Sequence, residues 1–429
     1  YKLPENWCWT NWGECGEFVA GSGFKNEYQG FTNYDIPFYK VSSLKTANET
    51  GYLCDNTNTV DETVRKKLKA ALIPANSLLF AKIGEAIRLN RRAINTVPCC
   101  VDNNMMAFVP IICQLKYAFY WSKGIDLYDF TNATTVPAIR KTDLEKISFP
   151  LAPLAEQQRI VDRIESLFAK LDEAKEKAQD VVDSFEIRKA AILHKAFTGE
   201  LTAKWREEHG VGMESWEKYK FNELGTLERG RSKHRPRNDP KLFGGKYPFI
   251  QTGDVARSGM YITEHTQTLS EVGAEQSKLF PKGTLCITIA ANIGDVSILT
   301  YDCCFPDSVV GFTPNERTLS EYIYYLMSTL QREIEANAPA TAQKNINLRI
   351  LNDLQLDIPS VAEQTQIVNQ VEYLFFQEQH AKEAAEAVLE QIDLMKKSIL
   401  ARAFRGELGT NDPSEESAAE LLKRGLEKK

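Results

Sequence analysis

The sequence lacks the features that would place it in a membrane or outside the cell. No apolar run among its 429 residues approaches the roughly 18 residues that a membrane-spanning helix needs. No charged and then apolar leader stands at its start, so nothing in the sequence indicates secretion. Apolar residues make up 43% and charged residues 26%, which is typical of globular proteins, and we predict a cytoplasmic location.

Metal-ligand spacing is missing too. The nine cysteines include no Cys-x-x-Cys pair, and the five histidines are scattered along the chain. Cys99-Cys100 and Cys303-Cys304 are adjacent pairs in apolar, strand-like runs, and we interpret them as buried thiols in a reducing compartment. The sequence therefore predicts neither a metal site nor a disulfide framework.

Nucleotide-binding motifs are also absent. No Gly-x-x-x-x-Gly-Lys-Ser/Thr loop occurs, so the sequence encodes no ATPase of the P-loop class. Gly21-Ser-Gly23 follows no clear Rossmann strand pattern and is better interpreted as a turn than as a dinucleotide-binding loop. We predict that the chain has no catalytic residues of its own.

What the sequence does contain is an internal duplication with an offset of 207 residues. Ala155-Glu-Gln157 recurs as Ala362-Glu-Gln364, and the run 189–201 recurs as 396–408 at the same offset. The parts before these runs repeat more weakly, through landmarks such as Trp7 and Trp216. The order is therefore globular, helical, globular, helical, with the helical parts better preserved than the globular ones.

Each well-preserved part is typical of one long helix. Between Ala155 and Phe197 there is no Pro or Gly, and apolar residues recur in steps of 4 and 3, with Arg188 as the one skipped position. The second copy keeps this stripe except at Glu378. Gly199 and Gly406 are the predicted helix terminators. So narrow a stripe cannot be buried by one helix alone, and a whole globular part lies between the two, so we predict an antiparallel coiled-coil pair.

The predicted fold class is α+β. Short strand-like runs such as 77–83 and 284–289 predict a curved sheet in each globular part, and 319–334 has a helical pattern. The predicted boundaries are globular domain 1 at 1–150, first helix at 151–200, globular domain 2 with a short linker at 201–357, second helix at 358–408, and a C-terminal tail at 409–429.

The net charge of −6 is unevenly distributed. Residues 1–150 carry 17 basic and 15 acidic side chains and residues 215–357 carry 16 and 17, whereas 155–214 carry 10 and 13 and 358–429 carry 9 and 13. Acidic residues thus concentrate in the helical parts, which leaves room for a basic, nucleic-acid-binding face on the globular parts.

Three places are candidates for contact with DNA. The first is a cation-rich loop within 229–237, suited to phosphates and to guanine through bidentate arginine. The second is a basic cluster just past a strand. The third is a pair of equivalent polar loops, whose side chains suit base edges or phosphates but are also common in turns. The candidate residues are, in that order, Arg229, Arg231, Lys233, Arg235 and Arg237; Lys82, Arg88, Asn90, Arg91 and Arg92; and Thr131, Asn132, Thr134 and Thr135 with Thr341, Gln343, Lys344 and Asn345.

The motifs at the helix ends resemble a known family. The run 150–161, Pro-Leu-Ala-Pro-Leu-Ala-Glu-Gln-Gln-Arg-Ile-Val, leads into a helix that ends Lys-Ala-Phe-Thr-Gly-Glu-Leu at 195–201. This is similar to the shared helical region of type I restriction–modification specificity subunits, and 341–345 resembles a loop late in their target recognition domains. The first copy, 131–135, lacks the Ala-Gln-Lys-Asn form of that loop.

The resemblance implies a role and a set of partners. Globular domains 1 and 2 would be target recognition domains, each reading half of a bipartite, asymmetric DNA sequence, with the helix pair as spacer. Two copies of a methyltransferase subunit would methylate adenine with S-adenosylmethionine, and a nuclease subunit using ATP and Mg²⁺ is an optional further partner. The chain has no Asn/Asp-Pro-Pro-aromatic loop to hold a flipped adenine, so catalysis belongs to the partners.

The acidic helix exteriors are the predicted partner-docking surface, represented by Glu176, Asp180 and Asp183, together with the tail around 418–424. An alternative from another class is a coiled-coil adaptor with two protein-binding domains and no DNA contact, which the net negative charge favours. A self-contained modification enzyme conflicts with the missing motifs.

Overall fold

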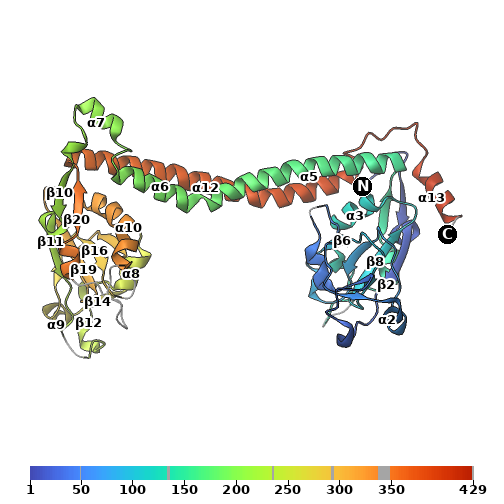
Figure 1. The fold of residues 1–429 in the computed structure, drawn as a ribbon, viewed down its shortest axis with the longest axis horizontal. Helices are drawn as coiled ribbons and strands as arrows, with labels where there is room; N and C mark the ends of the chain where they lie inside the picture. Colours follow the sequence, from blue (N-terminus) through green and yellow to red (C-terminus); the bar gives the residue numbers. More distant parts are fainter. Residues whose placement is uncertain (49, 133–135, 234–235, 291–293, 337–347, 428–429) are drawn as a thin grey trace. The chain divides into compact units, whose positions relative to one another are not determined.

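The computed structural model describes residues 1–48, 50–132, 136–233, 236–290, 294–336 and 348–427, with only the backbone described at 331–336. The chain divides into two compact units, which we define as unit 1, Tyr1–Ala178 with Ala387–Lys429, and unit 2, Gln179–Glu386. Each unit mixes helices and sheets, in agreement with the predicted α+β class (Figure 1). The finer boundaries of the predicted domains stay a prediction.

Unit 1 contains a main antiparallel sheet in the order β2-β8-β5-β6, a smaller sheet in the order β4-β3-β7, and the separate pair β1·β9. Its strands are β1 (Cys8–Asn11), β2 (Gly16–Ala20), β3 (Ile36–Tyr39), β4 (Thr59–Val60), β5 (Leu78–Ala81), β6 (Arg92–Ile94), β7 (Cys100–Val101), β8 (Met105–Pro110) and β9 (Ser148–Leu151). Its shorter helices are α1 (Trp12–Cys15), α2 (Glu62–Lys67), α3 (Leu115–Lys123), α4 (Lys141–Glu145) and α13 (Ala418–Leu426).

Unit 2 repeats this plan. Its main sheet has the order β11-β19-β16-β17-β13, its smaller sheet β14-β12-β18-β15, and β10 pairs with β20. The strands are β10 (Glu217–Lys220), β11 (Gly225–Arg229), β12 (Phe243–Phe249), β13 (Tyr261–Ile262), β14 (Gln267–Leu269), β15 (Leu279–Phe280), β16 (Leu285–Thr288), β17 (Val296–Leu299), β18 (Cys303–Cys304), β19 (Val309–Pro314) and β20 (Gln355–Ile358). The shorter helices are α7 (Ala203–His209), α8 (Thr252–Arg257), α9 (Glu271–Glu275), α10 (Ser320–Ala336) and α11 (Leu348–Asn352).

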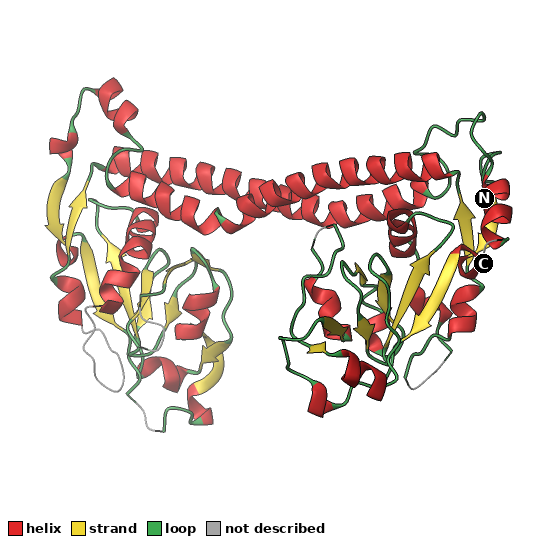
Figure 2. Cartoon of the chain, turned by 45° about the vertical axis from the view of Figure 1, so that its right-hand side comes forward, coloured by secondary structure: helices red, strands yellow, loops and turns green. Residues whose placement is uncertain are grey.

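The pairings of β3 and β12 confirm the duplication. β3 pairs antiparallel with β4 and parallel with β7, and β12 pairs antiparallel with β14 and parallel with β18. The predicted strands at 77–83 and 284–289 are β5 and β16, both fully buried at the centres of their sheets. Figure 2 shows strands flanked by helices within each unit. The adjacent cysteine pairs are buried thiols, as predicted.

The helical parts differ in one respect from the prediction. The second helix, α12 (Val361–Ala403), is continuous, but the first divides at Ser184 into α5 (Leu154–Asp183) and α6 (Phe185–Phe197). Ser184 Oγ donates to the backbone oxygen of Asp180, a back-bond that bends helices, and heptad periodicity carries no sign of it. Gly199 and Gly406 both have φ near +80°, which confirms them as helix terminators (77° and 79°).

The predicted apolar stripe is buried only in part. Ile160 and Ile367 are fully buried at the roots of their helices, and Ile392 is 2% exposed. Val388 and Met395, which the stripe places on the same face, are 44% and 45% exposed. A strict spacing of 3.5 residues drifts by about 20° per heptad on a straight helix of 3.6 residues per turn, which moves such positions off a shared face.

The two charged interruptions of the stripe meet each other in unit 2. Arg188 Nε lies 2.6 Å from a carboxylate oxygen of Glu378, and the two side chains are 32% and 22% exposed. Lys189 and Phe375 are also in contact, as are Phe185 and Lys382, so within unit 2 rising numbers on α6 face falling numbers on α12. This segment is therefore antiparallel, and opposite charges at the two exceptions were a signal that the sequence already contained.

Candidate nucleic-acid interface

The cation-rich loop leaves the end of β11 and lies on the surface of unit 2. Arg229, Arg231, Lys233 and Arg237 are all exposed. One nitrogen of the Arg237 guanidinium lies 3.0 and 2.8 Å from the two carboxylate oxygens of Asp307, and Arg229 Nε donates to the backbone oxygen of the same aspartate. Arg235 falls outside the described residues.

Contacts with the segment that follows α9 fix the course of this loop. The backbone nitrogen of Lys233 donates to Gln276 Oε1 at 2.7 Å, and Ser277 Oγ donates to the backbone oxygen of Arg231 at 3.2 Å. A pocket of about 170 Å³ lies alongside and includes Arg237 and Gln276 in its lining. The loop backbone is thus held while its cations project to solvent, an arrangement that suits contact with phosphates or base edges.

The second candidate cluster is largely turned inward. Arg92 is 4% exposed, and its guanidinium donates to Asn90 Oδ1 and to the backbone oxygen of Ser122. Burial lowers the pKa of Arg92. The amide nitrogen of Asn90 donates to Ile125 O at 2.9 Å. We remove Arg92 and Asn90 from the candidate contacts, because their polar groups serve the interior of unit 1.

The remaining members of this cluster keep some access to solvent. Arg88 is exposed, pairs with Glu85 at 2.9 Å and lies over the ring of Tyr128 at 3.5 Å from its centroid. Lys82 and Arg91 are half-buried. Their spacing in the sequence predicted one shared surface, but the structure exposes Arg88, half-buries Lys82 and Arg91, and buries Arg92.

Of the two polar loops, the structure describes only the first two candidate residues of the loop in unit 1. Thr131 Oγ1 donates to the backbone oxygen of Tyr128 at 2.9 Å, and Asn132 Nδ2 donates to the Asp143 carboxylate. The first contact is ordinary turn chemistry, whereas the second ties the loop to α4. The other candidates of these two loops lie outside the described residues: Thr134, Thr135, Thr341, Gln343, Lys344 and Asn345.

The predicted docking carboxylates are exposed. Glu176 lies on the part of α5 in unit 1, and Asp180 and Asp183 lie on its part in unit 2. Exposed aromatic residues on α12 were not predicted: Tyr373 is 63% and Phe376 is 59% exposed, and Phe376 packs edge-on against His380. They lie beside the apolar stripe, so its periodicity did not single them out.

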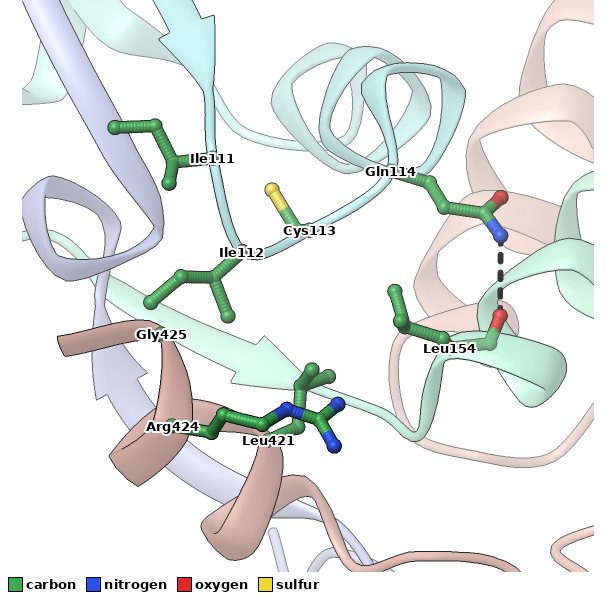
Figure 3. A pocket seen from close by; sticks show the side chains of 8 residues that line it. All are labelled: Ile111, Ile112, Cys113, Gln114, Leu154, Leu421, Arg424 and Gly425. Carbon is green, nitrogen blue, oxygen red and sulfur yellow. Dashed lines mark hydrogen bonds between the residues drawn. The ribbon is translucent and has the colours of Figure 1, made fainter. Parts of the chain in front are cut away.

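The C-terminal tail packs on unit 1 through its apolar face. Ala418 and Leu421 of α13 are buried in the core of unit 1, at 0% and 6% exposure. Figure 3 shows Leu421, Arg424 and Gly425 around a pocket of about 280 Å³ beside Ile112. The apolar face of the predicted docking tail is therefore already occupied, and its charged face alone, including the Arg424–Glu416 ion pair, is left for a partner.

The sequence analysis missed what the repeated Glu-Gln motif does. Gln157 Oε1 accepts from the backbone nitrogen of Gln114 at the start of α3, and Gln364 Oε1 accepts from that of Leu319 at the start of α10. Each amide also donates to a backbone oxygen five residues earlier, that of Ala152 or Pro359. The glutamines thus fasten each long helix to the globular part of its own unit in the same way.

The neighbouring glutamates fasten each helix start to the segment that follows the other helix. Glu363 is 1% exposed and accepts from Arg206 at 2.6 Å, Thr202 at 2.7 Å and Trp216 Nε1 at 3.1 Å, all beyond the end of α6. Glu156, fully buried, accepts from Thr410 and from the backbone of Asn411, beyond the end of α12. This explains why the motifs at helix starts and helix ends are preserved together.

The part of the chain that the structure describes lacks two features. Within that part of the chain, no cluster of three or more His, Cys, Asp or Glu side chains is arranged to hold a metal ion. Nor is any of the described helices long and apolar enough to cross a membrane.

Comparisons with known proteins agree with this layout. The family model described as "Type I restriction modification DNA specificity domain" matches residues 4–182 and again residues 213–388. The chain is 24% identical over 332 residues to the EcoBI specificity subunit of Escherichia coli and 27% identical over 311 residues to the EcoKI specificity subunit of strain K12. These matches cover 68% and 67% of this chain and 67% and 65% of the relatives, about two thirds of their length.

A solved structure shares the fold. The HsdS subunit from Thermoanaerobacter tengcongensis superposes with a TM-score of 0.68 at 18% identity, over 95% of this chain and 98% of the other.

Proposed function

The chain belongs to the type I restriction–modification DNA specificity family, and on that premise we propose that it recognises a bipartite, asymmetric DNA site on behalf of a methyltransferase. The observation that carries the proposal is the double match of one DNA specificity model to the two halves of the duplication. Two diverged copies of one reading domain in a single chain suit a site made of two different halves.

In this proposal the globular part of each unit is a target recognition domain. In unit 2 the exposed cations of the loop contact the duplex, since arginine suits both phosphate and the major-groove edge of guanine; they are Arg229, Arg231, Lys233 and Arg237. Asp307 holds Arg237 in the free protein, and a phosphate would take the place of its carboxylate. In unit 1, Arg88 and Arg91 remain candidates from the predicted cluster.

The long helices would set the separation of the two half-sites as an antiparallel coiled-coil pair. Support comes from the antiparallel contacts within unit 2 and from the pairing of Lys396 with Asp172 within unit 1. A rod of about 43 residues is roughly 60 Å long at 1.5 Å per residue, a length comparable with one and a half to two turns of DNA.

Catalysis would belong to partners that dock on the helices. We propose two copies of an adenine methyltransferase subunit that carries S-adenosylmethionine, with a nuclease subunit that uses ATP and Mg²⁺ as an optional further partner. The duplicated helices offer two related surfaces, and each identical partner needs one of them. Glu176, Asp180 and Asp183 supply charge on α5, and Tyr373 and Phe376 supply apolar area on α12.

Modified-base sequencing of the host genome, with and without this gene, tests the proposal. We expect deletion to abolish adenine methylation at one motif made of two short specified halves around an unspecified spacer, and reintroduction to restore it. If the methyltransferase partner is present and every methylated motif survives the deletion, the proposal is wrong and the adaptor without DNA contact gains support.

A further inference from the structure

The helix α2 of unit 1 corresponds to α9 of unit 2, which lies beside the cation-rich loop. In both units, the segment that follows the first strand of the main sheet packs against the helix that follows a strand of the smaller sheet. We define these contacts as junction 1, residues 21–28 with α2, and junction 2, residues 230–233 and 236–237 with α9 and the residues just after it. They correspond through the duplication.

The equivalence of α2 and α9 rests on topology and on their first turns. α2 follows β4 and α9 follows β14, and these strands pair in the same antiparallel sense with β3 and β12. Each helix is preceded by a capping residue whose side chain accepts a hydrogen bond from the backbone nitrogen three residues later. Asp61 accepts from Val64, and Ser270 accepts from Gly273. Both pairs are related by 209 residues.

Contacts of different kinds hold the two junctions together. In junction 1, Phe24 shares a small core with Val64 and Leu68, and the Lys67 ammonium lies 5.3 Å from the centre of the Tyr28 ring. In junction 2, the loop backbone is hydrogen-bonded to Gln276 and Ser277, as described above. The strand segment and the helix therefore form one continuous surface in each unit.

The two junctions carry their positive charge on different elements, junction 2 on the strand segment and junction 1 on the helix. In the sequence of junction 2 the segment 230–237 has four Lys or Arg and no acidic residue, while 270–279 around α9 has two Glu and one Lys. In junction 1 the segment 20–30 has one Lys and one Glu, while 61–70 around α2 has four Lys or Arg and two acidic residues. The cations therefore lie on the strand segment in unit 2 and on the helix in unit 1, at equivalent places in the fold.

The lysines of α2 are presented to solvent. Lys66 has 71% of its side chain exposed, and Lys67 and Lys69 are exposed too, whereas Arg65 is held by Glu62 and by the backbone oxygen of Ala70. Cations in a last helical turn are favoured by the helix dipole. That effect does not account for Lys69, which follows the helix at φ +50°, where glycine or asparagine would be less strained.

We propose that Lys66, Lys67 and Lys69 form a DNA phosphate-binding surface of unit 1, the counterpart of the arginine loop of unit 2. The inference rests on the proposed function and deepens it, because it assigns contacts in a place where sequence spacing gave none. Lysine is a point charge without the planar fork of arginine, so this surface grips the backbone and does not read bases.

The test uses the chain assembled with its methyltransferase partners and two labelled duplexes, one with the recognised site and one with that site scrambled. The variant is the triple substitution Lys66→Gln, Lys67→Gln and Lys69→Gln. The matched control is Lys66→Arg, Lys67→Arg and Lys69→Arg, which keeps the charge at the same positions. The mass of the complex and its melting temperature verify that both variants fold and assemble.

Three lost phosphate contacts lower the slope of log Kobs against log salt by about 2.7, since each contributes about 0.9. The affinity advantage of the wild type over the glutamine variant then shrinks roughly forty-fold between 50 and 200 mM salt, equally for both duplexes. The arginine variant keeps the wild-type slope. A glutamine variant with the wild-type slope overturns this inference alone, whereas a wild-type complex that binds neither duplex overturns the proposed function and the inference with it.

Discussion

The two units are copies of one plan that have kept their helix roots and changed their outer surfaces. Gln157 and Gln364 make the same hydrogen bonds to the same two places, although the rest of the two units has diverged widely. At the far side of each unit, α2 is rich in lysine where its counterpart α9 has glutamate. The buried glutamine amides keep their partners, because an unpaired buried group is costly, whereas exposed charge is free to move.

The buried glutamates show how far the copies can differ even at the root. Glu363 is paired with Arg206, itself only 6% exposed, and accepts from Trp216 Nε1. Glu156 is paired with Arg159, whose side chain is 35% exposed and which also reaches Glu415. Unit 2 therefore depends on a closed ion pair, and unit 1 on one that is open to water.

The largest expected effect comes from breaking the closed pair. Glu363→Ala leaves Arg206 charged and buried, which typically costs about 3–5 kcal/mol. Glu156→Ala costs less, because Arg159 can turn to water and keeps Glu415. Hydrogen exchange of α7 and of β10 should rise strongly in the first variant, whereas the second should leave both unchanged.

A double variant controls for the loss of the carboxylate itself. Replacing Glu363 and Arg206 together by methionine removes both charges and should recover most of the protection. Equal loss of protection in the single and double variants would contradict the closed-pair account.

The next effect concerns the arginine loop. Arg231→Ala should weaken binding of the recognised site by about 1–3 kcal/mol and relax the base preference at one position of one half-site, if its guanidinium reads guanine. Lys204→Ala, which removes an exposed cation of unit 2 paired with Glu208, is the matched control and should leave binding unchanged. Binding to duplexes with single-base changes measures the affinity and the base preference of each variant. An unaltered base preference in Arg231→Ala would show that Arg231 does not read a base.

Partner docking should respond more weakly. Reversing the exposed charges of Glu176, Asp180 and Asp183 to lysine should weaken methyltransferase binding on the order of tenfold, since each exposed ion pair contributes about 0.2–1 kcal/mol. A titration followed by sizing chromatography measures the complex formed. An unchanged complex mass across the titration would place the docking surface elsewhere, with Tyr373→Ala and Phe376→Ala as the next variants.

The smallest effect is expected at the charged exceptions in the helix stripe. Arg188 and Glu378 are partly buried and form one ion pair, so a double-mutant cycle with leucine at each position should give a coupling of about 1 kcal/mol. Thermal unfolding supplies the four free energies. A coupling of zero would show that the pair marks the register without stabilising it.

Helical periodicity predicted the features that depend on a long repeated pattern, and it missed the features that depend on a single side chain. It gave α12 as one helix and both glycine terminators, because these follow from a long pattern and from backbone freedom. It did not give the division at Ser184, which depends on one hydroxyl. It grouped Arg92 with surface cations by spacing alone, and the inward turn of that side chain depends on the carbonyl of Ser122, thirty residues away.

The site shows the same limit. The cations within 229–237 could be recognised from the sequence alone, because they lie in one loop. The lysines of α2 could be recognised as their counterpart only after the sheet order had aligned α2 with α9. The buried Glu156 and Glu363 were visible as a repeated motif, and their role depends on segments more than 140 residues away that folding brings to them.

One exchange tests the central claim, that each unit reads one half of the site. Residues 213–357 are replaced by the corresponding segment of a family member whose site is known, and the methylated motif is mapped by modified-base sequencing. The account predicts that one half of the motif changes to that of the donor while the other half and the spacer length stay as they were. A motif in which both halves change, or neither does, would contradict it.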